Sequence, residues 1–181
     1  MRLRLWPLIM SIHHRNNVHI EGTGAKTMLL AHGFGCDQNM WRFIVPAFAN
    51  DFRVVLFDHV GSGKSDATQY SPEKYGTLDG YANDVLEIID AVGGGPVIFV
   101  GHSVSAMIGI LAAARHPLAF ERLILIGPSA CYINDAGYVG GFNKVDIEDL
   151  LATLDSNYLG WSSATAPVIT GNPDRLNSLV N

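Results

Sequence analysis

Four short runs of apolar residues recur along the first 130 positions, and each ends in turn-forming residues. They begin at positions 27, 53, 96 and 122 and read TMLLAHGFG, RVVLFDHVGSG, PVIFVGHS and RLILIGPS. Valine, isoleucine, leucine and phenylalanine follow one another in these runs without alternating with polar residues. Such runs are typical of strands that are covered on both faces. The pattern therefore predicts four buried strands, each followed by a turn.

Helical periodicity fills the gaps between these runs. Apolar residues recur at helical spacing over 78–92, and Thr77 is placed to cap that helix. A second helix is expected over 38–48, where Pro46 predicts a kink or an early end. A third, over 104–115, is almost wholly small or apolar and should be buried. Strands that alternate with helices indicate an α/β fold around a parallel sheet.

The pattern changes after the fourth strand. Residues 131–143 are rich in glycine, asparagine and tyrosine, and Asp146 can then cap a helix whose apolar residues keep helical spacing. No strand signal follows before the last residue. We therefore divide the chain into an N-terminal extension (1–16), the N-terminal part of an α/β core (17–130) and the start of an inserted helical segment (131–181).

The composition is that of a folded globular protein, and it narrows the range of partners. Hydrophobic residues make up 48% of the 181 positions, charged residues 16%, and the net charge is −5, so no basic field favours nucleic acid or anionic lipid. No apolar run approaches the roughly 18 residues of a membrane span. Cys36 and Cys131 are too few for a disulfide framework, and residues 1–10 lack a signal-peptide cleavage site. We expect a cytoplasmic protein that binds neither nucleic acid nor membranes.

GSGKS, at residues 61–65, resembles the end of a phosphate-binding loop. That motif, G-x-x-x-x-G-K-[ST], begins with a glycine, where this chain has Asp58. The residues that follow lack helical periodicity and include Pro72, so no helix would present its amino terminus to a phosphate. We interpret the segment as a glycine-rich turn that leaves a strand.

GHSVSA, at residues 101–106, is a stronger chemical signal. A predicted strand runs directly into Ser103 and a predicted helix starts directly after it, which is the setting of the nucleophile elbow G-x-S-x-G. Ser105 stands where the motif has its last glycine, a mild departure because serine is also small. We interpret Ser103 as a nucleophile; the alternative is a serine at an ordinary strand end.

Acyl transfer also requires hydrogen-bond donors for the oxyanion. HGFG, at residues 32–35, leaves the first apolar run. In proteins with this elbow, one donor comes from that loop and one from the residue after the nucleophile. The candidates are the backbone N–H groups of Phe34 and Val104. H-G-x-G alone indicates only a turn, but in this order with the elbow it favours an oxyanion hole.

Five segments together resemble the α/β-hydrolase family: HGFGCDQNMW, VVLFDHVGSGKSD, LDGYANDV, GHSVSAMIG and GPSACYINDAGYVGGF. They are most similar to the subfamily that contains the bacterial sigma-B stress regulator RsbQ and the plant karrikin and strigolactone receptors. The resemblance implies that Ser103 is the nucleophile and that Phe34 and Val104 form the oxyanion hole. It also implies that the helical segment is a lid over an apolar pocket.

The resemblance implies a set of residues that contact substrate at the pocket and its rim. They are Phe34, Tyr132, Tyr158 and Trp161. The alternative is that these aromatic side chains belong to an ordinary core, which is commoner on amphipathic helices.

The acid and the base of a catalytic triad are not found by the same reasoning. In this fold the order is serine, acid, histidine. The only histidine after Ser103 is His116, which ends a predicted helix with no acid in between. His102 should point away from Ser103, and His32 and His59, at the ends of neighbouring strands, offer only a weaker alternative. The resemblance implies that the acid, the histidine and further strands follow this chain, which would then be the N-terminal part of an enzyme.

Three functions remain open. A serine hydrolase of small apolar esters or lactones would use Ser103 with an acid and a histidine that this chain lacks. A sensing module would bind a small apolar ligand and then a signalling protein, such as a phosphatase, in a stress-response pathway. An inactive fragment would do neither. No cofactor or metal is expected, because no histidine or carboxylate pair has the helix-face spacing of metal ligands.

Overall fold

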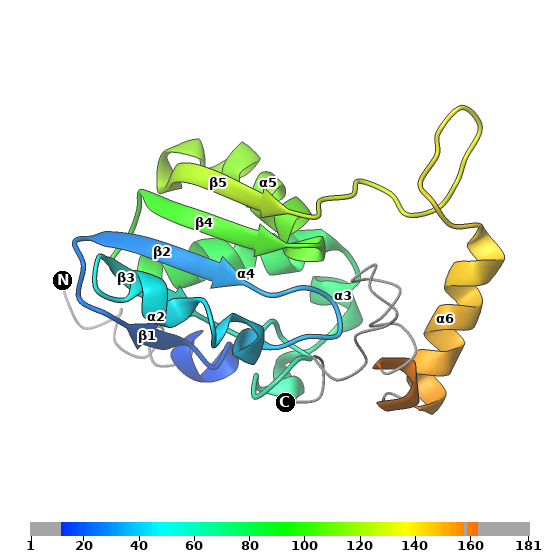
Figure 1. Ribbon diagram of the computed structural model, residues 1–181, viewed down its shortest axis with the longest axis horizontal. Coiled ribbons are helices and arrows are strands. Elements are labelled where there is room, and N and C mark those ends of the chain that lie inside the picture. Colours follow the sequence, from blue (N-terminus) through cyan, green and yellow to red (C-terminus); the bar gives the residue numbers. More distant parts are fainter. Residues whose placement is uncertain (1–11, 158, 163–181) are drawn as a thin grey trace. The chain divides into compact units, whose positions relative to one another are not determined.

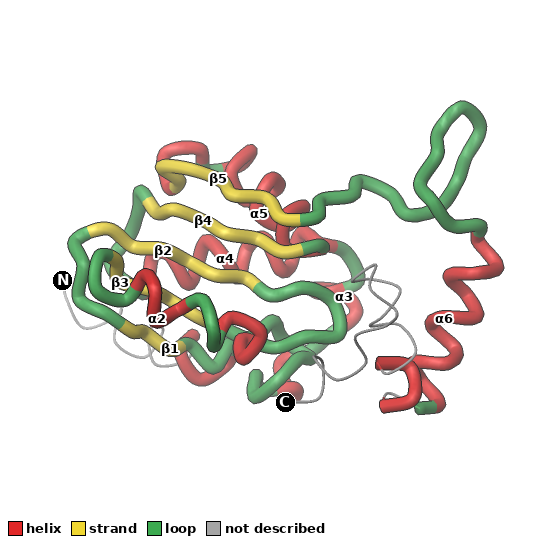
Figure 2. The backbone as a smooth tube through the Cα atoms, viewed as in Figure 1, coloured by secondary structure: helices red, strands yellow, loops and turns green. Residues whose placement is uncertain are grey.

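The computed structural model describes residues 12–157 and 159–162. The chain divides between residues 129 and 130 into two compact units. The first unit is a five-stranded sheet with helices on both faces (Figures 1 and 2). Its strands are β1 (His19–Glu21), β2 (Lys26–Ala31), β3 (Phe52–Leu56), β4 (Val97–His102) and β5 (Phe120–Ile126). Its helices are η1 (Gln38–Trp41), α2 (Val45–Phe48), η2 (Ala67–Gln69), α3 (Pro72–Tyr75), α4 (Leu78–Ala91), α5 (Val104–Arg115) and η3 (Pro117–Ala119).

The strands lie in the order β1-β3-β2-β4-β5. β1 pairs with β3 in antiparallel orientation, and all other neighbours are parallel. The predicted α/β fold with a mostly parallel sheet is therefore confirmed. β1 was not predicted, because its three residues are exposed and form no apolar run.

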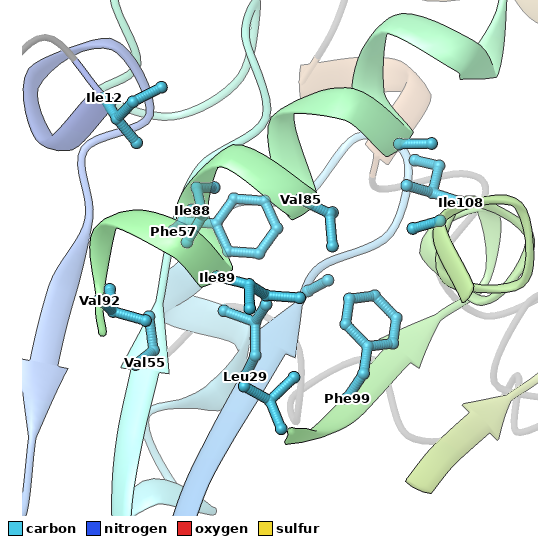
Figure 3. Packing of buried hydrophobic residues seen from close by; sticks show 14 residues of the cluster. Ile12, Leu29, Val55, Phe57, Val85, Ile88, Ile89, Val92, Phe99 and Ile108 are labelled. Atoms are coloured by element: carbon cyan, nitrogen blue, oxygen red, sulfur yellow. The ribbon is translucent and has the colours of Figure 1, made fainter. Parts of the chain in front are cut away.

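The two faces of the sheet explain why the apolar runs do not alternate. Successive side chains of a strand point to opposite faces. Leu29, Val55 and Phe99 pack against α4 and α5 on one face (Figure 3). Leu30 and Val54 pack against η1 and α2 on the other. Because each buried large apolar side chain contributes about 1.5–3 kcal/mol, both faces contribute to stability.

The fourth apolar run forms the predicted strand, β5, but the expected burial of both faces is wrong for it. In the described part of the chain β5 is an edge strand that pairs only with β4. The side chains of Ile124 and Ile126 are exposed.

The predicted helices form, with one interruption. Thr77 caps α4 by accepting the N–H of Asp79, as expected. The continuous helix expected over 38–48 is wrong: η1 and α2 replace it. Pro46 lies in the first turn of α2, where its missing N–H is tolerated. α5 has the expected bounds, although Ile110 on it is exposed.

The second unit contains α6 (Lys144–Ser156) and the loop before it. Asn143 caps α6, and Asp146, at the third helical position, accepts the N–H of Asn143 in return. The helix therefore begins earlier than the start at Asp146 that the sequence suggested. That this unit is a lid stays a prediction.

Candidate active site

Ser103 is the single residue between strand β4 and helix α5. Its backbone has φ 56° and ψ −120°, a strained conformation for a residue other than glycine. The Ser103 N–H donates to the carbonyl of Ile126 at 2.8 Å, and the Ser103 carbonyl accepts the N–H of Ala106 at 2.9 Å. Strand β5 and the first turn of α5 thus hold the strained residue at the carboxyl end of the sheet.

Two glycines let strand β4 and helix α5 approach closely. A Cβ atom on Gly101 would lie 2.6 Å from the carbonyl oxygen of Ser105, and one on Gly109 would lie 2.3 Å from a ring carbon of Phe99. Real Cβ atoms do not come so close to other heavy atoms. The turn therefore has the tight strand-to-helix packing that the elbow motif requires.

The loop after β2 packs directly on this turn. A Cβ atom on Gly33 would lie 2.5 Å from Nδ1 of His102 and 3.2 Å from Cβ of Ser103. His102 and Ser103 thus both lie next to Gly33. Phe34, the next residue of the loop, has a side chain that is 56% exposed.

A pocket of about 160 Å³ lies beside the loop and the first turn of α5. Its lining is mostly apolar and aromatic, and it includes both residues proposed from the sequence as oxyanion donors. The lining residues are His32, Gly33, Phe34, His59, Val60, Ser62, Leu78, Tyr81, Val104 and Ile108. The structure therefore brings Phe34 and Val104 to one pocket.

Three buried polar residues lie close together at the carboxyl end of the sheet. They are His32, His59 and Ser105, and we name them the Ser105 cluster. The Ser105 hydroxyl donates to the carbonyl of His32 at 2.5 Å and lies 2.7 Å from Nε2 of His59. The backbone N–H of His59 donates to Nε2 of His32 at 3.1 Å. Nδ1 of His32 lies 2.9 Å from the carbonyl oxygen of Gly33.

These contacts assign a proton to each hydrogen bond of the cluster. Nε2 of His32 is an acceptor, so its Nδ1 carries the proton and donates to Gly33. The hydroxyl proton of Ser105 goes to His32, so Nε2–H of His59 donates to Ser105. Nδ1 of His59 is buried without a hydrogen-bond partner. His59 therefore contacts Ser105 rather than acting as a base for the proposed nucleophile.

The imidazoles at this site are neutral near pH 7. Burial, together with the neighbouring His32, lowers the pKa of His59 to about 3. Burial also lowers the pKa of His32, against the opposing effect of its bond to Gly33. The pKa of His102 is lowered by burial and by His32. Because a neutral imidazole carries only one proton, the proton positions assigned above hold near pH 7.

The partnership of Ser105 with His59 was missed at the level of sequence. The signal was present, since Ser105 departs from the glycine of the motif, but it was interpreted only as a tolerated small residue. His32 and His59, which the sequence placed at the ends of neighbouring strands, lie close together, with ring centroids 4.8 Å apart.

The other residues expected at the pocket belong to the second unit. Tyr132 is 42% exposed and Trp161 is 8% exposed. Tyr158 lies outside the described residues. Contact of these three residues with substrate stays a prediction.

The GSGKS segment is a turn folded around Asp58. The Asp58 carboxylate accepts hydrogen bonds from Asn17 Nδ2 at 2.7 Å, the Gln38 N–H at 2.9 Å and the Lys64 N–H at 2.9 Å. Burial alone would raise the pKa of Asp58, but these hydrogen bonds together lower it. Asp58 therefore organises the turn.

Residues 12–157 and 159–162 contain no helix that is both long and apolar enough to cross a membrane. In the same part of the chain, no three histidine, cysteine or carboxylate side chains gather in a way that could hold a metal ion.

Comparison with known proteins gives relatives that are similar in sequence. The receptor Karrikin insensitive 2 CA of Petunia hybrida is 42% identical over 160 residues, which are 88% of this chain and 59% of the receptor. Strigolactone esterase D14 of Arabidopsis thaliana is 44% identical over 155 residues, which are 86% of this chain and 58% of the esterase. The chain therefore spans somewhat less than three fifths of the length of these relatives.

A solved structure and a family model agree with these relatives. The structure of olei00960, a hydrolase from Oleispira antarctica, matches with a TM-score of 0.81 and 46% identity, over 88% of this chain and 59% of the hydrolase. The model of the alpha/beta hydrolase fold matches residues 26–166. With its strained serine between β4 and α5, the chain belongs to the α/β-hydrolase family.

Proposed function

We propose that the protein is a serine hydrolase of small apolar esters or lactones, with Ser103 as its nucleophile. The observation that carries this proposal is the strained backbone of Ser103 at the β4–α5 turn, against which the Gly33 loop packs. That turn resembles the nucleophile elbow in both conformation and setting. The strigolactone esterase among the relatives supports the same chemistry.

In the proposed reaction, Oγ of Ser103 attacks the ester carbonyl carbon while its proton passes to a general base. The carbonyl electron pair moves onto oxygen, and the N–H groups of Phe34 and Val104 stabilise the resulting oxyanion. Collapse of this intermediate breaks the bond to the alcohol, which leaves with the proton. Water then releases the acid from Ser103 by the same steps.

The general base is the part of the mechanism that remains unassigned. In this fold the usual order along the chain is serine, acid, histidine, and no histidine of this chain fits that order. His116 follows Ser103 but is the C-cap residue of α5, which at 1.5 Å per residue places it about 20 Å along the helix from the elbow. His32 and His59 are engaged in the Ser105 cluster. An acid and a histidine beyond residue 181 stay a prediction.

The lining and size of the pocket support a small apolar substrate. Phe34, Val60, Leu78, Val104 and Ile108 contribute apolar surface to a pocket of about 160 Å³. Such a pocket favours a compact apolar acyl or lactone group. Tyr132, Tyr158 and Trp161 would extend it if the second unit acts as a lid.

The test is covalent labelling of the complete gene product with a fluorophosphonate, located by mass spectrometry of the peptides. Ser103 is the expected site, and Ser103→Ala should abolish labelling. Ser65→Ala is the matched control, because that hydroxyl lies in the turn around Asp58 and bonds to the carbonyl of Ser62. Failure of the unmodified protein to label at Ser103 would contradict the proposal.

A sensing role is the second candidate, favoured by the receptors among the relatives. The pocket would bind a small apolar ligand, and the complex would engage a signalling protein, such as a phosphatase of a stress pathway. Slow turnover of esters together with ligand-dependent partner binding would support it. Fast turnover of generic esters without a partner would contradict it.

The third candidate is an inactive fragment, and it has a direct test. Ester hydrolysis is measured for the 181-residue chain and for its Ser103→Ala variant. Hydrolysis that depends on Ser103 would contradict the inactive fragment.

A further inference from the structure

We propose that Ser105 and His59 are positioning residues that hold the oxyanion loop against the nucleophile elbow through a buried chain of hydrogen bonds. The inference rests on the proposed function of Ser103 and adds two residues to it. Neither side chain has to touch substrate in this role.

The first step of the argument is that the chain of hydrogen bonds links three separate segments. Ser105 lies in the first turn of α5, His32 directly follows β2, and His59 follows β3. The Ser105 hydroxyl holds the carbonyl of His32, while His59 contacts Ser105 through Nε2 and His32 through its backbone N–H. The hydroxyl therefore fixes where the loop leaves β2 relative to the helix that follows Ser103.

The second step concerns the peptide between Gly33 and Phe34. Its carbonyl accepts Nδ1–H of His32, and the same peptide carries the proposed donor, the N–H of Phe34. This peptide is trans, because the single cis peptide of the described chain joins Gly95 and Pro96. In a trans peptide the C=O and N–H groups point in opposite directions. The His32 hydrogen bond that orients the carbonyl therefore also orients the donor.

The third step explains why the hydroxyl of Ser105 matters at a position where glycine is usual. Ser105 is fully buried. Without its hydroxyl, Nε2–H of His59 and the carbonyl of His32 would each lose a buried hydrogen bond. Because Nδ1 of His59 already lacks a partner, the ring would keep no hydrogen bond to hold it in place. The loop would then be free to shift away from Ser103.

The experiment compares Ser105→Ala, His59→Leu, the double variant and His59→Gln in the complete gene product. Amide NMR shifts and hydrogen exchange of Phe34 report on the loop without requiring turnover. We expect faster exchange of the Phe34 amide by about tenfold or more in Ser105→Ala and His59→Leu, as expected for local opening. His59→Gln keeps an N–H donor and should retain protection; His59→Leu serves as the disrupting variant if Ser105→Ala fails to fold.

Kinetics supply the second readout. Ester hydrolysis by Ser105→Ala should lose about tenfold in kcat with little change in KM, because a displaced oxyanion donor weakens binding of the transition state alone. The KM comparison uses this variant, because His59 itself lines the pocket. The double variant should lose no more than either single variant, since both break the same chain. Ser65→Ala should behave like the unmodified protein.

The outcomes separate this inference from the proposed function. An unchanged Phe34 amide in Ser105→Ala, or additive losses of kcat in the double variant, would overturn the positioning role. Lower thermal stability with unchanged kcat and an unchanged Phe34 amide would reduce Ser105 to a packing residue. Failure of Ser103 to label in the unmodified protein would instead overturn the proposed function, and the Phe34 amide would still decide whether the loop is held as described.

Discussion

Two polar clusters in the first unit, each with a buried centre, differ in charge. The Ser105 cluster consists of neutral groups at the carboxyl ends of β2 and β3 and the start of α5. The second, which we name the Asp84 cluster, is ionic and consists of Arg15, Lys74, Tyr75, Asp84 and Glu87. Asp84 is fully buried, lies 2.8 Å from Nη2 of Arg15 and from Nζ of Lys74, and accepts the Tyr75 hydroxyl at 2.9 Å.

The charges of the Asp84 cluster are compensated within it. Arg15 also pairs with Glu87 at 2.8 Å. Burial raises the pKa of Tyr75, and the negative charge of Asp84 adds to that effect. A buried charge is tolerated only with such partners, which here come from the segment before β1, from α3 and from α4. The ionic cluster therefore fastens segments of the fold to one another.

The Ser105 cluster needs no opposing charge because its imidazoles are neutral. Each of its hydrogen bonds has a direction that the assigned protons determine. A neutral network can therefore fix the orientation of backbone groups beside a site where negative charge would develop. The comparison suggests that ion pairs stabilise this fold while neutral hydrogen bonds shape its site, and four predictions test that division.

The largest expected effect is on the ionic cluster. Asp84→Ala should lower the free energy of unfolding by about 3–5 kcal/mol, because it removes the buried partner of both Arg15 and Lys74 and leaves Arg15 only the more exposed Glu87. Urea unfolding measures this loss. The Phe34 amide shift, measured where the variant remains folded, should not change.

Asp79→Ala is the matched control. Asp79 lies on α4, as Asp84 does, but forms its ion pair at the surface, with Arg115 of α5. Its loss should stay within about 1 kcal/mol. Equal losses of unfolding free energy in the two variants would show that the buried ion pairs of Asp84 stabilise the fold no more than the surface ion pair of Asp79. A shifted Phe34 amide in Asp84→Ala would show that the two clusters are not separate.

The second prediction is an acid sensitivity that comes from His59. Its pKa of about 3 in the folded protein lies below the usual 6.5, so the unfolded chain binds more protons between these values. Stability from this group is therefore complete above about pH 6.5 and falls as the pH drops toward 3, by about 1.4 kcal/mol per unit at most. From pH 7.5 to 4.5 the loss should approach roughly 3 kcal/mol.

His59→Gln provides the test, since it removes the titrating ring while keeping a donor for Ser105. Urea unfolding at both pH values should show a weaker pH dependence in this variant than in the unmodified protein. His32 and His102, whose pKa values are also lowered, supply the remaining dependence in the same direction. An unchanged pH dependence would mean that His59 is not buried in its neutral form.

The third prediction concerns the contact between loop and elbow. Gly33→Ala places a methyl group 2.5 Å from Nδ1 of His102 and 3.2 Å from Cβ of Ser103, so one of these groups must move. We expect a loss of about 1–3 kcal/mol in stability, as for other overpacked sites. Labelling of Ser103 should also slow in the protein that remains folded, because the added methyl group disturbs the contact between loop and elbow. Gly61→Ala is the comparison variant: its added Cβ meets nothing within 4 Å, and its positive φ, which Gly33 does not have, gives backbone strain without a clash.

The sequence predicted the elements of the site better than the contacts between them. Local patterns were sufficient for β4, α5 and the turn at Ser103, because strand, turn and helix are encoded in consecutive residues. They failed for the helix over 38–48, which is interrupted between η1 and α2, before Pro46.

The Ser105 cluster could not be predicted in this way. Ser105 and the carbonyl of His32 are 73 positions apart, and Ser105 and His59 are 46 apart. Only the order of the strands in the sheet brings them together. No local pattern distinguishes a hydroxyl that is merely small from one that holds a loop.

The smallest expected effect comes from Thr77→Ala, which removes the cap of α4 at the end that precedes Asp84. Loss of the hydrogen bond to the Asp79 N–H should cost about 1 kcal/mol, measured by urea unfolding. Thr77→Ser keeps the acceptor and should restore most of that stability. Because the cap supports the helix that carries Asp84, the change should leave the labelling rate of Ser103 as it is. A slower labelling rate would show that stability on the ionic side of the fold reaches the site, and that the two clusters share one function after all.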